Sequence, residues 1–163
     1  MPKLFLLIGA VLLLFGFQFW NSGLHLLYEE YPGAPVCFYT GVDQTVSYAA
    51  APAPVRSGNT LIFRCAAAEA RVLRGELKSI KGESICFEGG FSDAKRAVEL
   101  YKAKVLGTEV LDGGDYHITV IYVSSPYLNR AEKVNGAFIN MQIAVNEGTG
   151  FVTIGIPLIL GSF

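Results

Sequence analysis

The pattern of apolar and polar positions divides this chain into a long apolar start and a region of shorter, alternating segments. The run Leu4–Trp20 holds seventeen residues without a charge, close to the length of a membrane-spanning helix at 1.5 Å per residue. Only three residues separate it from a further apolar stretch that ends at Tyr28. Residues 1–28 therefore predict an N-terminal transmembrane anchor, with Trp20 and Tyr28 near the outer interface.

The charges that flank this run predict its orientation. Lys3 precedes it, whereas Glu29 and Glu30 follow it, an asymmetry that favours an inside N-terminus and an exported remainder. A cleaved signal peptide is the alternative interpretation. It is disfavoured because the run is longer than a usual signal core and no small-x-small pattern closely follows Trp20. A buried core helix is a third interpretation, which the unbroken apolar start disfavours.

The next segment, residues 29–58, is rich in proline and alanine. It contains four prolines and the run Ala49–Pro54, a composition typical of a linker. Short strands at 36–40 and 45–48 are a weaker alternative. We therefore expect a spacer over 29–58 and one extracytoplasmic domain over 59–163, since about 105 residues form one ordinary domain.

Two strand–helix units open this domain. Thr60–Cys65 has the branched and aromatic content of a strand, and Ala66–Ile80 repeats apolar residues at helical spacing before Gly82. The apolar stripe of this helix consists of Ala70, Leu73, Leu77 and Ile80. Glu83–Glu88 predicts a second strand, on which these two glutamates face opposite sides.

A second helix follows Gly89-Gly90. Ser92 is the expected N-cap, and Asp93 lies in the first turn, where its charge favours the helix dipole. The apolar residues of this helix are Ala94, Ala97, Val98, Tyr101 and Val105, and Gly107 ends the pattern.

The remaining sequence predicts strands. Segments 108–111 and 116–124 flank a short loop typical of a hairpin, and 137–145 alternates with Asn140 and Gln142 on its polar face. A last strand, 151–156, stops at Pro157. Two one-sided helices among these strands predict an α+β fold, a mainly antiparallel sheet with both helices on one face.

Charge and cysteine content exclude several function classes. From Glu29 onward the chain has 14 acidic and 12 basic side chains, which argues against nucleic-acid binding because such proteins normally carry a basic excess. Cys37, Cys65 and Cys86 match no metal-site spacing. Buried free thiols are the favoured interpretation, with a Cys65–Cys86 disulfide and a reactive thiol as alternatives. No cofactor motif is present.

Four short motifs resemble the YwmB-like proteins of spore-forming Gram-positive bacteria. These motifs are Gly82-Glu-Ser84, Ser125-Pro-Tyr-Leu128, Asn140–Val145 and Val152–Ile159, so that the resemblance covers roughly residues 60–163. It implies an exported or anchored protein with a fold like that of the TATA-box-binding protein, no established activity, and a role in the cell envelope or in sporulation. A DNA-binding fold does not imply DNA binding here, since the charge is unsuitable.

Catalysis is weakly indicated. A thiol nucleophile needs a base and an orienting group, and Cys86, His117 and Asp115 are the available candidates. His117 lies in mid-strand, where a histidine is usually packed or solvated, and no nucleophile-elbow or phosphate-loop motif is present.

A basic flank of the first helix is the candidate partner surface. It consists of Arg71, Arg74, Lys78 and Lys81, although such a run is most often simply a solvated face. We therefore expect a membrane-anchored extracytoplasmic domain that works by binding an envelope protein or the anionic envelope, and no enzyme. The alternatives are an exported enzyme that uses Cys86 and His117, and a structural subunit that self-associates through edge strands. The sequence does not identify the partner or ligand.

Overall fold

A computed structural model describes residues 23–42, 44, 53–112 and 117–159. Within them an eight-stranded antiparallel sheet has the order β2-β3-β1-β4-β10-β9-β6-β5, and β7 and β8 form a separate hairpin. In chain order the elements are α2 (His25–Glu30), β1 (Pro35–Thr40), β2 (Val55–Ser57), β3 (Thr60–Ala66), α3 (Ala67–Glu76), β4 (Ile80–Glu88), α4 (Phe91–Leu100), β5 (Lys104–Asp112), β6 (His117–Ser124), β7 (Glu132–Val134), β8 (Ala137–Ile139), β9 (Met141–Asn146) and β10 (Phe151–Ile156).

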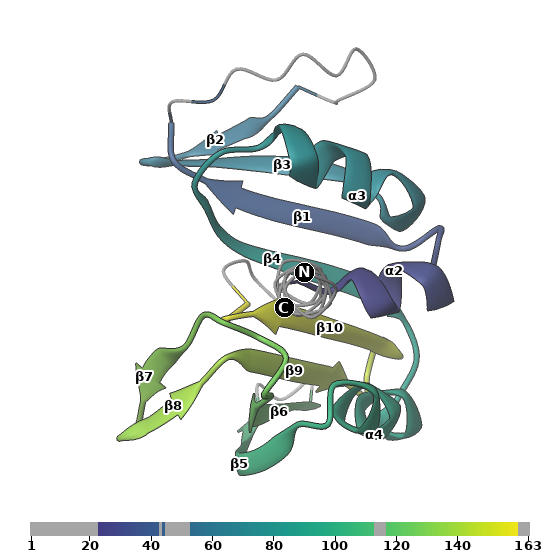
Figure 1. The fold of residues 1–163 in the computed structure, drawn as a ribbon. Coiled ribbons are helices and arrows are strands. Elements are labelled where there is room, and N and C mark those ends of the chain that lie inside the picture. Colours follow the sequence, from purple (N-terminus) through teal and green to yellow (C-terminus); the bar gives the residue numbers. More distant parts are fainter. Residues whose placement is uncertain (1–22, 43, 45–52, 113–116, 160–163) are drawn as a thin grey trace, which may run out of the picture.

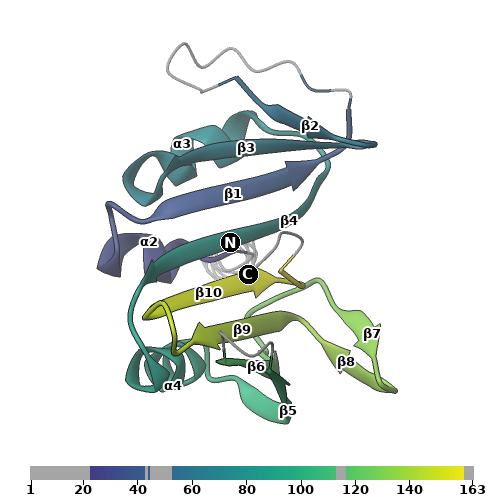
Figure 2. The ribbon, with the colours of Figure 1, turned by 180° about the vertical axis from the view of Figure 1, so that it is seen from behind.

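All three helices lie on one face of the sheet (Figure 1), and the opposite face is seen from behind (Figure 2). We call these the helix-covered face and the open face. The main core lies beneath the helices, where Phe38, Ile85 and Ile154 from three adjacent strands are fully buried. The predicted α+β fold with a mainly antiparallel sheet is confirmed, but the described residues contain three helices where two were expected.

The prediction of a spacer over 29–58 is wrong, because these residues include a central strand of the sheet. β1 pairs with β3 on one side and with β4 on the other, and its Val36 and Phe38 are fully buried. Pro35 is the first residue of β1, a position where a missing N–H costs the ladder little. The domain therefore begins well before residue 59.

The expected continuation of the anchor through Tyr28 is also wrong. Leu27 and Tyr28 of α2 and its N-cap residue Leu24 are buried against the sheet, so these apolar residues fill the domain core. The run Leu4–Trp20 lies outside the described residues.

The first predicted helix is confirmed, although its end was placed four residues too late. α3 ends at Glu76, and Ser79 adopts a left-handed φ of 51° before Ile80 enters β4. Leu77 and Ile80 lie beyond the end of the helix, and both still pack against the core. Helical periodicity does not distinguish such residues from a last helical turn.

The second helix is confirmed over Phe91–Leu100, and Asp93 lies in its first turn. The cap differs from the prediction. Gly90 occupies the N-cap position, and its N–H donates to the Asp93 carboxylate at 3.0 Å, whereas Ser92 is already helical. Val105 belongs to β5, where it is 49% exposed.

The C-terminal strands are confirmed with one interruption. β5 and β6 form the expected hairpin, but the predicted strand 137–145 breaks at Asn140 into β8 and β9. The β7–β8 hairpin was not predicted. Asn135 and Gly136 both have positive φ, at 49° and 85°, as a type I′ turn requires.

Candidate functional site

A buried polar cluster forms where the described chain begins. Glu83 of β4 is 1% exposed on the helix-covered face, and its carboxylate accepts the Leu24 N–H and forms an ion pair with Arg74 of α3. The Tyr101 hydroxyl donates to the Gly23 carbonyl at 3.1 Å. We call Gly23, Leu24, Arg74, Glu83 and Tyr101 the junction cluster. It joins the N-terminal segment to the centre of the sheet.

The close approach of these side chains favours glycine at position 23. An added Cβ would lie 2.7 Å from the Glu83 carboxylate and closer still to the Arg74 guanidinium. Such separations are shorter than real Cβ contacts, so that a larger residue would have to displace the ion pair. The backbone at Gly23 is therefore held tightly by side chains from α3 and β4.

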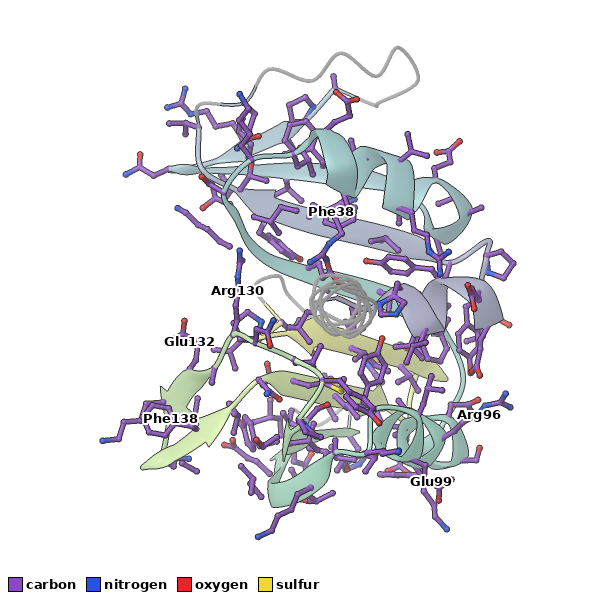
Figure 3. The ribbon with its side chains drawn as sticks, in the orientation of Figure 1. Phe38, Arg96, Glu99, Arg130, Glu132 and Phe138 are labelled. Carbon is purple, nitrogen blue, oxygen red and sulfur yellow. The ribbon has the colours of Figure 1, made fainter. Side chains whose placement is uncertain are left out.

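Polar contacts at the surface join α2 to both longer helices. Glu29 pairs with Arg71 of α3 at 2.5 Å, and Glu30 pairs with Arg96 of α4 at 2.9 Å. Figure 3 shows Arg96 on the outer side of α4. These pairs are largely exposed, so each contributes little to stability. Their effect is to set the position of α2 between α3 and α4.

The structure separates the four residues of the predicted basic surface. Arg71 and Arg74 lie on α3, but Arg74 faces inward to Glu83. Lys78 lies in the turn after α3 and Lys81 on β4, and both are exposed. The Lys78 backbone is held by the Gln44 side chain, whose Oε1 accepts its N–H at 2.8 Å. The exposed cations are thus Arg71, Lys78 and Lys81, which we call the cationic turn.

The predicted catalytic pair is not brought together. Cys86 is on the open face of β4, because its neighbours Ile85 and Phe87 face the helices. His117 is the first residue of β6, which lies three strands from β4 in the sheet order. Its neighbour Ile118 is on the open face, so His117 is on the helix-covered face. Three strand spacings correspond to about 14 Å. The His117 Nδ1 instead lies 3.5 Å from the Asp112 Oδ1. Asp115 lies outside the described residues.

The cysteines are free thiols. Cys65 packs against the core on the helix-covered face, whereas Cys86 is on the open face, so a Cys65–Cys86 disulfide is excluded by geometry. Burial raises the pKa of the Cys65 thiol to about 11, and burial also raises the pKa of Cys37. Both of these thiols are therefore protonated near neutral pH and poorly nucleophilic.

Two of the motifs quoted for the family resemblance meet in a buried clamp. The Asn140 amide accepts the Ser125 N–H at 2.7 Å and donates to the carbonyls of Ser125 and Leu128 at 2.7 and 2.9 Å. The Ser125 hydroxyl donates to the Tyr101 carbonyl at 2.6 Å. These contacts fix the loop after β6 against the end of α4, which is a structural role.

An open pocket of about 380 Å³ lies where the loop after α2 meets the end of β4. Tyr31 stacks on Phe87 beside it, with ring centroids 3.8 Å apart, and Cys86, Glu88 and Phe151 contribute to its wall. No histidine lines it, so Cys86 has no imidazole base there. The residues that line the pocket are mainly apolar, and Glu88 contributes a carboxylate.

Sequence patterning missed the role of Glu83. The signal was present, because Glu83, Ile85 and Phe87 alternate on one face of the strand, which puts a carboxylate in line with two core residues. A charge on a core-facing register is rarely left unpaired. That its partners are Arg74 and the Leu24 N–H, which are distant in sequence, was not encoded in any local pattern.

The chain matches no protein-family model, and no curated protein or solved structure is significantly similar to it. Among the residues that the structure describes, no helix has the length and apolarity that crossing a bilayer requires. The same residues contain no group of three His, Cys, Asp or Glu side chains arranged to hold a metal ion.

Proposed function

We propose that this chain is a membrane-anchored extracytoplasmic domain that works by binding. The observation that carries the proposal is the uncharged run Leu4–Trp20, which lies only a few residues before the buried Gly23. A run of seventeen uncharged, mainly apolar residues is typical of a membrane segment. The flanking charges, Lys3 before and Glu29 and Glu30 after, favour export of the domain.

In the proposed arrangement the domain would lie close to the bilayer. Three Cα–Cα steps lead from Trp20 to Gly23 and span at most about 11 Å. Gly23 is held on the helix-covered face by Tyr101 and by the side chains of Arg74 and Glu83. The helix-covered face, which carries α3, would therefore be turned toward the membrane.

The cationic turn is the proposed contact with an anionic partner. Arg71, Lys78 and Lys81 are exposed, and only Arg71 is in a described ion pair, with Glu29. Cations near a membrane attract anionic headgroups or acidic protein patches within a Debye length. The resemblance to YwmB-like proteins favours an envelope or sporulation setting for this contact.

Binding is favoured over catalysis because of the distribution of reactive groups. The rival enzyme hypothesis needs Cys86 and His117 in one cleft, and these residues lie on opposite faces of the sheet. Substitution of either residue by alanine should therefore leave partner capture unchanged wherever the protein folds.

The topology is tested by protease accessibility. We expect a C-terminal tag on the membrane-bound chain to be removed when protease is added to intact protoplasts, because the domain is exported. The measurement is an immunoblot of the tag in the membrane fraction, with a cytoplasmic protein as the control for lysis. A protected tag, or release of the whole chain into the medium, would show that the anchor hypothesis is wrong.

Charge reversal tests the cationic turn. We expect Lys78→Glu with Lys81→Glu to reduce partner capture by crosslinking in native membranes at least about tenfold, since both charges face solvent and electrostatic contacts govern such encounters. Stability should change by less than about 0.5 kcal/mol. Arg74 must be spared, because its reversal would break the buried ion pair.

The matched control is Lys95→Glu with Lys133→Glu, which changes the net charge equally on exposed residues of α4 and β7. Equal capture by both double variants would remove the cationic turn from the proposal.

A further inference from the structure

We propose that the free edge of β5 pairs with β5 of a second copy of this chain, so that two sheets join into one. β5 is a terminal strand of the sheet order and spans nine residues, whereas the other terminal strand, β2, has three. Seven of the nine residues of β5 are exposed. Among the described residues no strand pairs with the outer edge of β5, and a long edge of this kind presents unpaired N–H and C=O groups to a further strand.

The apolar side chains of this edge support a protein partner. Val110, Val105 and Leu106 are exposed by 63%, 49% and 39%. Glu109 is the charged residue in the stretch 105–111, and its carboxylate accepts a hydrogen bond at 2.8 Å from Tyr122 of the neighbouring strand β6. Charged side chains commonly protect an edge from pairing, but this one is directed back onto its own sheet.

Symmetry restricts how two β5 strands can pair. Identical antiparallel strands in one continuous sheet are related by a two-fold axis perpendicular to the sheet, so paired residues must share a face. A pairing centred on Glu109 would place two carboxylates opposite each other, which is destabilising. A pairing centred on Thr108 places Leu106 opposite Val110 of the second copy, and Gly107 opposite Glu109.

The Thr108-centred register is therefore self-complementary. It buries two exposed apolar pairs and sets no like charges opposite each other. β5 has one extra residue, Leu106, between the paired residues Val105 and Gly107, so the regularly paired part of the strand runs from Gly107 to Asp112 and Leu106 directly precedes it.

The same symmetry keeps both helix-covered faces on one side of the joined sheet. Gly23 is on that face in each copy, so both N-terminal segments would leave toward the same side. This geometry is compatible with two anchors in one bilayer, although the pairing itself does not depend on the proposed anchoring.

Disulfide trapping of the full chain in mild detergent tests the register. We expect Thr108→Cys to form a crosslinked dimer under mild oxidation at least about fivefold more than Glu109→Cys or Val110→Cys, since only residue 108 lies opposite itself. The unaltered chain gives the background from its three native cysteines, and Val55→Cys, 58% exposed on the other edge, is the matched control. Strongest trapping at residue 109, 110 or 55 would overturn the proposal.

A second variant pair tests the interface without engineered thiols. Val110→Lys should weaken dimerisation measured by light scattering at least about tenfold, whereas Val55→Lys should leave it unchanged. Circular dichroism checks that both variants fold. A chain that is monomeric at micromolar concentration, or equal effects of the two substitutions, would also overturn the proposal.

Discussion

Replacing Glu83 with alanine is expected to destabilise the domain by about 3 kcal/mol, because it breaks the buried ion pair with Arg74 and removes the acceptor of the buried Leu24 N–H. Removal of one member of a buried ion pair costs about 3–5 kcal/mol. The lower value applies because Arg74 keeps a side-chain exposure of 28%, whereas that of Glu83 is 1%. The thermal midpoint of the full chain in mild detergent, followed by circular dichroism, should fall by roughly 10 °C.

Two controls make this result specific to the junction cluster. Glu88→Ala removes an exposed carboxylate from the same strand and should change stability by less than about 0.5 kcal/mol. Arg74→Met together with Glu83→Met replaces both charges by apolar groups and should recover the part of the loss that comes from the broken ion pair, whereas the part that comes from the Leu24 N–H should remain. A midpoint for Glu83→Ala equal to that for Glu88→Ala would contradict the assigned role.

The fragment 59–163 is expected not to fold, in contrast to the fragment 23–163. The shorter fragment lacks β1, so β3 and β4 lose the strand that joins them, together with the fully buried Val36 and Phe38. Loss of two such side chains alone removes about 4 kcal/mol, and the unpaired ladders add to it. Urea unfolding under reducing conditions should show a cooperative transition for 23–163 and none for 59–163.

Comparing the two fragments tests whether residues 29–58 are a dispensable spacer or part of the folded sheet. A cooperative transition of 59–163 with native-like near-ultraviolet circular dichroism would mean that β1 is dispensable. An intermediate fragment, 32–163, retains β1 but lacks α2 and with it the buried Leu24, Leu27 and Tyr28. It should be markedly less stable than 23–163, which measures how far the N-terminal segment supports the core.

The buried thiols do not provide a pH-dependent switch near neutrality. Burial raises the pKa of Cys65 to about 11, so the folded state holds this proton more tightly than the unfolded state. The stability that this gives is present below the ordinary thiol pKa and is lost as the pH rises through the folded value.

Local sequence patterns by themselves determined the elements with strong periodicity. The amphipathic helices around Leu73 and Ala97, the β5–β6 hairpin and the alternating strand 151–156 follow from which face each residue presents, and this is encoded by residues close in sequence. The α+β class follows, because one-sided helices must cover a sheet. The opposite facing of Glu83 and Glu88 was predictable for the same reason.

Only the tertiary structure decided which segments are central and which charges are buried. The segment Val36–Thr40 has a linker-like context, and it becomes a core strand because β3 and β4 supply partners for both of its edges. Tyr28 has the character of a membrane-interface residue in sequence, yet the junction cluster holds its helix in the core. Arg74 and Arg71 are indistinguishable by local pattern, but only Arg74 lies over Glu83. These outcomes depend on contacts between residues distant in sequence, which local propensity does not encode.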